Sequence, residues 1–471
     1  MICDVFAALV WALMRFSKNI GRAMSTPITL TVGDITLTYD TMYVGMDHGM
    51  LFQETDRRRL PNESTNGDDV ESTEEDDLDV ALGEICFCRS LRSMVPRLEL
   101  LGYTLATVKA DYDRVVKRDV EDRAIDGELD PASQRRPMNF DQFIVFIEKY
   151  SVAKLSDNYV QDYDERHRAQ QGLFASDSSI GLFPEGNPER DFGGYSERSH
   201  FGNLLGFLTP YSMLRALAEN PANLELNVVW DYGRFVDAGW GDDYEFVACA
   251  RREQTYLVAT EGKSDTNILK RAIELIRPEI QDFVRFVDAA DWHSFTGAGS
   301  LIKFAEGLAK IDVHNRTVFV LDNDAEGREA YQNMHRFSFP ANMAAMVLPD
   351  IDELRCFPTR GPSGITNADI NGCAAAIECY LDLRLEGRKP PQITWTNYKD
   401  KLGAYHGALD HKDSYSEAFY RVTPEAVESG RYDITKLSLV LDALMTQCTQ
   451  IAERMHPFGS VALASRRSPI K

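Results

Sequence analysis

The sequence lacks an excess of basic residues. Its 471 residues include 51 Lys and Arg against 73 Asp and Glu, which gives a formal net charge of −22. Proteins that bind nucleic acid non-specifically usually carry a basic surface, so a surface that is basic throughout is excluded. Any nucleic acid must be held by a local patch, by metal ions or with the help of a partner.

Closely spaced cysteines are also missing. The eight cysteines include no Cys-x-x-Cys pair, and Cys86 and Cys88 are separated by a single residue. A structural zinc site usually needs such pairs, so the sequence disfavours one. Scattered cysteines are typical of reduced thiols in a cytosolic protein, and we expect a cytoplasmic location.

The N-terminus has no hydrophobic run long enough for a normal transmembrane helix. Its apolar run, Val5 to Met14, is too short. Its basic residues follow the run instead of preceding it, so a signal peptide fits poorly. We predict that residues 1–23 are a dispensable extension and that the chain has no stable membrane insertion. A peripheral membrane contact by this segment remains the alternative.

Residues 24–254 read as one N-terminal domain of mixed β and α structure. Pro27 to Tyr39 predicts strand, turn and strand, because apolar residues alternate on both sides of Gly33-Asp34. Asn62 to Asp79 holds nine acids and no base, which is typical of a solvated loop. Residues 80–150 are mainly helical in pattern, residues 155–200 predict a polar linker, and Phe246 to Ala250 predicts a strand.

From residue 255 the pattern changes to strands alternating with helices. Such alternation predicts a parallel sheet with helices on both faces, here over residues 255–352. We expect residues 353–471 to be mainly helical, beginning with a helix from Asp369 to Leu383. The predicted strands of the sheet are Tyr256–Ala259, Phe283–Val287, Thr317–Leu321 and Ala344–Leu348.

Two carboxylate clusters follow predicted strands. Glu261 ends the first strand, and Asp322 and Asp324 follow the third. Because the carboxyl ends of parallel strands share one edge, we expect these side chains to converge. Crowded carboxylates repel each other unless a cation neutralises them, and Mg²⁺ prefers oxygen ligands. Lys263 adjoins this edge, where its charge suits a phosphate, and His293 is a weaker candidate to line the same cleft.

Glu-Gly followed by Asp-x-Asp-x-Glu-Gly is similar to the motifs of the Toprim domain, which topoisomerases, primases and some nucleases share. The resemblance implies that Asp322 and Asp324 bind Mg²⁺, with Mn²⁺ as a substitute. It also implies that Glu261 binds metal or acts as general acid or base, and that Glu326 assists. Asp369, at the start of a predicted helix, is either a third metal carboxylate or a helix cap.

The whole chain resembles the bacterial HEPN/Toprim-associated proteins. The segments that carry this wider resemblance are Ile28–Gly33, Leu98–Leu105 and Asp369–Glu378. The resemblance implies an α/β Toprim domain within a multidomain α+β chain. It also implies a role in bacterial defence against phage, with a partner protein of a defence operon or an oligomer left open.

The most economical function is a Mg²⁺-dependent nuclease that hydrolyses phosphodiester bonds in DNA or RNA. Hydrolysis needs only metal ions, water and a positioned phosphate. A type I topoisomerase would need a gate domain with a nucleophilic tyrosine, and a primase often carries a zinc ribbon. The alternative is a regulatory module that senses nucleic acid or a nucleotide without turning it over.

Overall fold

A computed structural model describes residues 26–41, 45–60, 84–125, 136–158, 172–174, 176–184, 196–287, 297–362, 364–384, 390–399 and 403–457. Three predicted segments, the extension 1–23, the acidic loop 62–79 and much of the linker 155–200, lie outside these residues. The chain divides into two compact units. Unit 2 consists of Leu100–Gly102 and Arg251–Met455, and unit 1 of the remaining residues.

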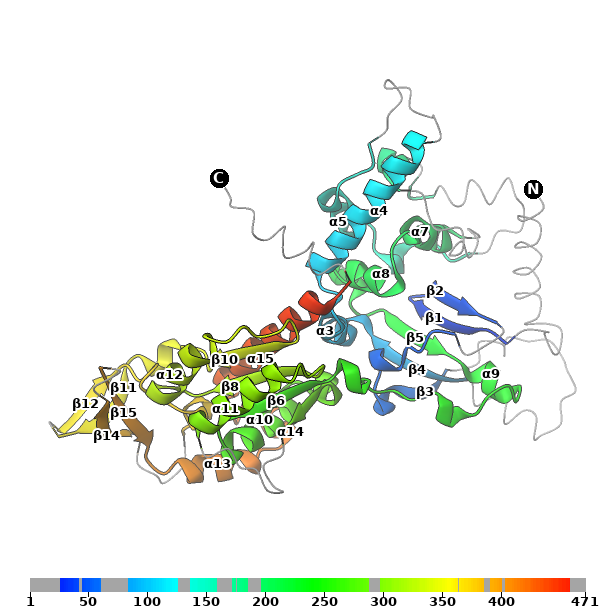
Figure 1. Ribbon diagram of the computed structural model, residues 1–471. Coiled ribbons are helices and arrows are strands. Elements are labelled where there is room, and N and C mark those ends of the chain that lie inside the picture. The colour runs from blue at the N-terminus through cyan, green and yellow to red at the C-terminus, as the bar shows by residue number, and fades with distance from the viewer. Residues whose placement is uncertain are drawn as a thin grey trace, which may run out of the picture. The chain divides into compact units, whose positions relative to one another are not determined.

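Unit 1 is built on an antiparallel sheet of order β2-β1-β5-β4-β3 (Figure 1). Its strands are β1 (Ile28–Val32), β2 (Ile35–Asp40), β3 (Arg57–Leu60), β4 (Glu84–Ser90) and β5 (Asn227–Asp231). The predicted hairpin is present. Gly33 and Asp34 both have positive φ, 49° and 66°, which is the backbone that a tight two-residue hairpin turn requires.

The helices of unit 1 supply much of its buried core. They are α3 (Leu91–Leu101), α4 (Leu105–Ile125), α5 (Phe140–Lys149), α7 (Glu197–Leu205), α8 (Pro210–Leu217) and α9 (Gly233–Asp237). The expected helical stripes are buried, among them Leu98 on α3 and Phe143 on α5. The strand predicted over Phe246–Ala250 is absent. Phe246 is instead fully buried and stacks on Tyr232, with ring centroids 4.1 Å apart.

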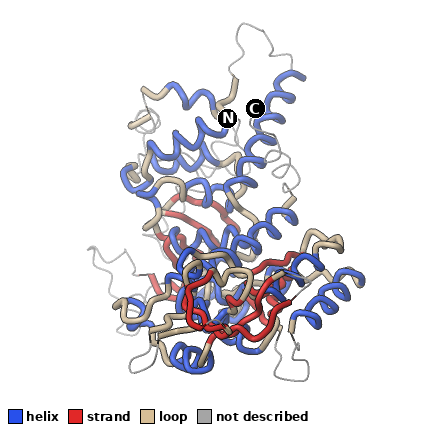
Figure 2. Tube along the Cα trace, turned by 90° about the vertical axis from the view of Figure 1, so that its left-hand side faces the viewer, coloured by secondary structure: helices blue, strands red, loops and turns tan. Residues whose placement is uncertain are grey.

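Unit 2 contains the parallel sheet that the sequence predicts, in the order β10-β8-β6-β7. Its strands are β6 (Tyr256–Thr260), β7 (Val284–Phe286), β8 (Arg316–Leu321) and β10 (Met343–Val347). Buried apolar side chains on both faces of β6 and β8 explain why these strands lack alternation. Figures 1 and 2 show helices around these strands.

Two pairs of helices pack against this sheet. The helices α11 (Ala298–Lys310) and α12 (Ala325–Met334) share one apolar cluster with Phe319, Leu321 and Ala345 of the strands. The helices α10 (Lys263–Ile276) and α15 (Thr435–Met455) contact each other and the strands β6, β8 and β10. No helix in the described part of the chain is both long and apolar enough to cross a membrane.

The expectation that residues 353–471 are mainly helical is wrong. A second sheet of unit 2, of order β12-β11-β14-β15, occupies much of this region, followed by the helices α13 (Lys412–Tyr420), α14 (Pro424–Glu428) and α15. Its strands are β11 (Phe357–Gly361), β12 (Gly364–Ala368), β14 (Ile393–Lys399) and β15 (Ala404–Leu409). The strands β14 and β15 are rich in Thr, Tyr, Trp and Ile, which favour strands.

The predicted helix from Asp369 to Leu383 is also wrong. Gly372 has a φ of 73°, which interrupts any helix there. The next residues form β13 (Ala374–Ala375), which pairs antiparallel with β9 (Asn323–Asp324). Pairing with the segment that carries Asp324 outweighs the helix preference of three consecutive alanines. The segment after the sheet therefore lies directly against the acidic motif.

Candidate metal centre

The parallel sheet places the first two predicted acidic residues side by side. Glu261 follows β6 and Asp322 follows β8, and these neighbouring strands pair with Thr260 opposite Val320. The backbone N–H of Asp322 donates to Glu261 Oε1 over 3.0 Å. Glu261 and Asp322, sixty-one residues apart in the sequence, are thus in direct contact at the carboxyl edge of the sheet.

Asp324 is fixed by its position at the start of α12. Its Oδ1 accepts from the backbone N–H of Gly327 over 2.7 Å, so Asp324 caps the helix. Its Oδ2 lies 3.7 Å from Nδ1 of His406, on β15. A Cβ atom at Gly327 would lie only 2.1 Å from the carbonyl oxygen of Asp322. A glycine is therefore required for the acidic segment to fold back on its own helix.

Burial and mutual repulsion strongly perturb these carboxyls. Burial, and then the charge of Asp265, raises the pKa of Asp322 well above its ordinary value. Burial is also the main cause that raises the pKa of Glu261 to about 8, and the charge of Asp324 adds to it. Burial and the charge of Glu378 raise the pKa of Asp265 to about 7. Without a counter-charge, these groups hold protons at neutral pH.

The remaining predicted residues lie at different distances from this cluster. Lys263 is exposed on the first turn of α10. Glu326 is exposed on the first turn of α12, and its charge also raises the pKa of Glu261. Asp369 is exposed, and its Oδ1 accepts hydrogen bonds from the backbone and side chain of Asn371. His293 lies outside the described residues.

The sequence reasoning preferred Asp369 to Glu378, and the structure places the two carboxylates the other way round. Glu378 is 3% exposed. Its Oε1 accepts from Oγ of Ser264 over 2.9 Å, and Nζ of Lys412 lies 3.9 Å away. The error came from treating residues 369–383 as one helix, in which the two acids would lie on opposite faces. Without that helix, Glu378 joins Asp265 beside Asp322.

The same segment also closes over Asp322. The backbone N–H of Ile377 donates to Asp322 Oδ1 over 3.0 Å. Asp265 accepts from the backbone N–H of Gly262 over 2.9 Å, at the start of α10. Neither Asp265 nor His406 was singled out from the sequence. Asp265 stood in the Glu-Gly motif as a helix cap, and His406 is about eighty residues beyond Asp324 in a region predicted to be helical.

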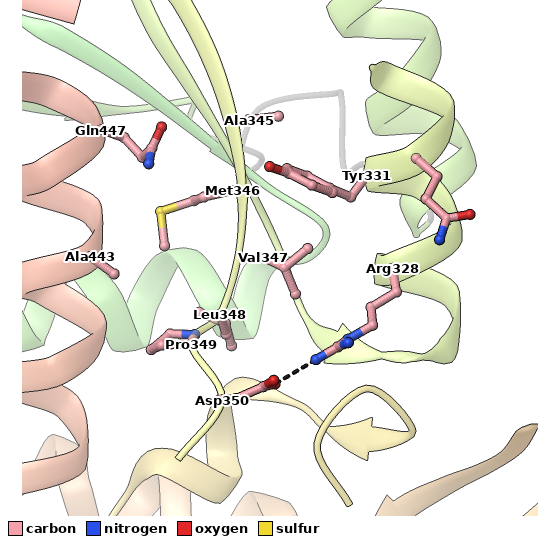
Figure 3. A pocket seen from close by; sticks show the side chains of 11 residues that line it. Arg328, Tyr331, Ala345, Met346, Val347, Leu348, Pro349, Asp350, Ala443 and Gln447 are labelled. Atoms are coloured by element: carbon pink, nitrogen blue, oxygen red, sulfur yellow. Dashed lines mark hydrogen bonds and ion pairs between the residues drawn. The ribbon is translucent and has the colours of Figure 1, made fainter. Parts of the chain in front are cut away.

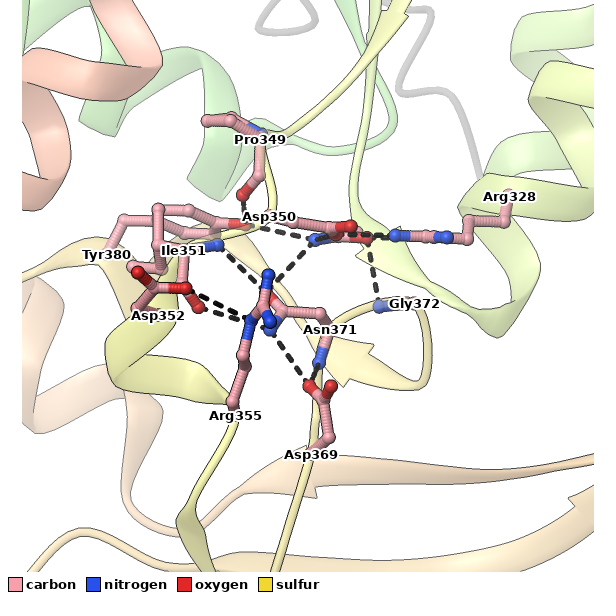
Figure 4. A network of polar contacts seen from close by, with 11 residues as sticks. Arg328, Pro349, Asp350, Ile351, Asp352, Arg355, Asp369, Asn371, Gly372 and Tyr380 are labelled. Atoms are coloured by element: carbon pink, nitrogen blue, oxygen red, sulfur yellow. Dashed lines mark hydrogen bonds and ion pairs between the residues drawn. The ribbon is translucent and has the colours of Figure 1, made fainter.

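Asn323, between the two aspartates, anchors the acidic segment to a polar network (Figure 4). It is fully buried. Its Nδ2 donates to Asp350 Oδ1 over 2.7 Å, and its Oδ1 accepts from Nε of Arg328 over 3.0 Å and from the backbone N–H of Gly372 over 2.9 Å. Arg328 and Asp350 also form an ion pair. The two aspartates are thereby held in position by the residue that separates them.

A pocket of about 510 Å³ adjoins this network along β10 (Figure 3). Arg328 and Tyr331 line it from α12, and Ala443 and Gln447 line it from α15. The ion pair between Arg328 and Asp350 lies at one end. The carboxylates of the acidic cluster are not among its lining residues, so the pocket is a feature separate from the candidate metal centre.

The acidic cluster suits a hard divalent cation. Its donors are all carboxylate oxygens, and the raised pKa values show negative charge that the protein leaves uncompensated. Among the described residues, no three His, Cys, Asp or Glu side chains already form a metal cage. Mg²⁺ does not need one, since it usually takes one or two carboxylates, waters and substrate phosphate. Glu261, Asp322 and Asp324 therefore fit Mg²⁺.

Comparison with known proteins identifies the N-terminal part of the chain. The family model described as HEPN/Toprim N-terminal domain 1 matches residues 24–254. This match confirms the resemblance to the HEPN/Toprim-associated proteins. Searches of curated proteins and of solved structures found no match.

Proposed function

Since residues 24–254 belong to the HEPN/Toprim N-terminal domain 1 family, we propose that unit 2 is the catalytic partner of this module, a Mg²⁺-dependent nuclease of the Toprim type. It would hydrolyse phosphodiester bonds in DNA or RNA. The family resemblance extends this proposal to bacterial defence against phage.

One observation carries the proposal. Carboxylates from neighbouring parallel strands meet at the carboxyl edge of the sheet, where Asp322 N–H contacts Glu261 Oε1 over 3.0 Å. Ligands of such sheets bind at this edge. Burial also leaves the carboxyls with raised pKa values, which are frequent at functional sites. Structural carboxylates would instead be paired with cations, as Asp350 is with Arg328.

Each residue has a distinct part in this proposal. Asp322 and Asp324 would hold the metal ion, with Glu261 as a third ligand or as general acid or base. A bound Mg²⁺ would lower the pKa of a coordinated water and neutralise charge on the phosphate. Glu261, with a pKa raised to about 8 in the metal-free protein, is able to accept or release a proton near neutral pH. Lys263, exposed at the start of α10, would attract the phosphate backbone.

Replacement of the two aspartates tests the proposal. Asp322→Asn and Asp324→Asn keep the acceptor atoms that hold Ile377 N–H and Gly327 N–H but remove the charge. We expect each to abolish cleavage of plasmid DNA and total RNA in Mg²⁺ or Mn²⁺. The loss should exceed the roughly 10–100-fold that changes outside the ligand shell cost. Asp352→Asn is a matched control, because its side chain is 90% exposed.

The outcome also separates the two functions left open by the sequence. Cleavage that EDTA stops and that both variants lack supports the nuclease. Full activity in both variants would contradict the metal centre. Binding of nucleic acid or nucleotide by the wild-type protein without turnover in either metal would favour the regulatory module instead.

A further inference from the structure

The second sheet of unit 2 presents exposed aromatic side chains. Tyr398 on β14 and Tyr405 on β15 are 51% and 50% exposed. They are paired directly across the two strands, with ring centroids 4.9 Å apart. Trp395 lies 5.8 Å from Tyr405 by the same measure. We call these three residues the aromatic platform.

Glycines on both neighbouring strands shape this platform. Trp395 pairs with Gly407 of β15, where an added Cβ would lie 2.8 Å from Cε3 of the indole. An added Cβ at Gly361 of β11 would lie 3.3 Å from Cδ1. The indole therefore lies close over bare backbone on both sides. This leaves a broad, flat aromatic surface beside the two exposed tyrosines.

The platform is continuous with the candidate metal centre. His406, whose Nδ1 lies 3.7 Å from Asp324 Oδ2, immediately follows Tyr405 on β15. Adjacent Cα atoms are about 3.8 Å apart. β15 also contacts β13, which pairs with the segment that carries Asp324. A chain bound on the platform is thus within a few residues' reach of the acidic edge.

The charge of the protein favours stacking as the means of binding. A chain with a net charge of −22 and an acidic catalytic edge repels a phosphate backbone. Aromatic rings bind unpaired bases through their faces, whatever the net charge, and every base has such a face. Bases in a duplex are already stacked on one another, so only single strands offer these faces freely.

A protein partner fits the platform less well. The exposed residues between Trp395 and Tyr398 are the polar Thr396 and Asn397, whereas protein interfaces have a more apolar core. The loop that joins β14 to β15 also carries Lys399 and Lys401 against the single acid Asp400 in the sequence. Both features suit a polyanion whose bases stack on the rings.

We propose that the aromatic platform binds the unpaired bases of single-stranded nucleic acid. This makes single-stranded DNA or RNA the substrate class of the neighbouring acidic edge. The assignment of a substrate rests on the proposed nuclease function, whereas the binding itself does not depend on it.

Binding without cleavage tests the platform by itself. The probes are a fluorescein-labelled poly-dT oligonucleotide of about 20 nucleotides and a duplex of equal length, measured by anisotropy with full-length protein in EDTA. We expect the single strand to bind more tightly than the duplex. The double variant Tyr398→Ala/Tyr405→Ala should lose about 30-fold in affinity, because each ring lost costs about fivefold or more.

Two control variants show whether the rings themselves are responsible. Tyr398→Phe/Tyr405→Phe keeps both rings and should bind like the wild type. Tyr244→Ala removes a tyrosine that is 76% exposed in unit 1 and should also change nothing. Unchanged melting temperatures would show that the exposed tyrosines do not support the fold.

The outcomes keep this inference distinct from the proposed function. Undiminished binding by the double alanine variant, or a preference for duplex, would overturn the platform even if the enzyme cleaves. No binding of either probe by the wild type would also overturn it and would leave the rings to a protein partner. Ring-dependent binding without cleavage in Mg²⁺ would support the platform and contradict the nuclease.

Discussion

The metal-free protein should lose stability as the pH rises, and Glu261 is expected to be a main cause. Its pKa is raised from the ordinary value of 4.5 to about 8. The native state therefore keeps a proton that the unfolded state releases above pH 4.5. A group of this kind favours folding least at high pH, so its penalty grows between the two pKa values and is complete above the higher one.

The size of the effect follows from the two pKa values. Between about pH 5 and about pH 8.5, linkage predicts a loss of roughly 4 kcal/mol for this one group. For a unit of about 200 residues this corresponds to a melting temperature lower by about 8–16 °C. Asp322, whose pKa is also raised, acts in the same direction.

Thermal unfolding in EDTA at these two pH values measures the effect. Glu261→Gln keeps an acceptor for the N–H of Asp322 but cannot ionise, so the variant should be the more stable protein at about pH 8.5 and similar to wild type at about pH 5. Saturating Mg²⁺ should stabilise the wild type at the higher pH and the variant less. Glu329→Gln, an exposed glutamate on α12, is the matched control.

The reasoning would be refuted by a wild-type melting temperature that rises or stays constant over this range while Glu261→Gln behaves identically. It would also be refuted if Mg²⁺ stabilised the wild type and Glu261→Gln equally, because the carboxylate would then not contribute to the metal site.

Two further predictions concern residues that hold the acidic segment. Gly327→Ala should destabilise unit 2 and abolish cleavage, because its Cβ would meet the Asp322 carbonyl oxygen at 2.1 Å, whereas Gly307→Ala on α11, with open space around it, should be neutral or stabilise by up to about 1 kcal/mol; calorimetry of the pair checks this, and equal melting temperatures would contradict it. Asn323→Ala leaves the buried partners of its amide unpaired and should cost about 2–4 kcal/mol in denaturant unfolding, and a cost below about 0.5 kcal/mol would show that the network does not support the aspartates.

The parallel sheet and the edge where Glu261 meets Asp322 were predictable from sequence, for a local reason. Each predicted strand is an uninterrupted apolar run that ends at an acid, and the topology of parallel strands then brings those ends together. Nothing longer-ranged than this rule was needed. The hairpin at Gly33-Asp34 was predictable in the same way, because two residues with positive φ determine it.

The C-terminal part of unit 2 could not be predicted in this way. The alanines at 374–376 favour a helix by intrinsic preference, and only the pairing of Ala374 with Asp324 makes them extended. Because that contact joins residues fifty positions apart, no local pattern reveals it. The same failure concealed Glu378 and His406, whose importance lies entirely in what they meet across the fold.

The pairing of β13 with β9 also has a consequence for the order in which the protein becomes competent. Residues 261 and 322 are synthesised well before Ile377 and Glu378, which complete the surroundings of Asp322. A partly synthesised chain would hold the sheet edge with Asp322 lacking its contact from Ile377. Domains generally fold as units during synthesis, N-terminal ones first. Unit 1 up to residue 250 would thus be made, apart from its C-terminal residues, before the acidic edge is complete, so the chain's own topology delays a destructive activity until late in synthesis.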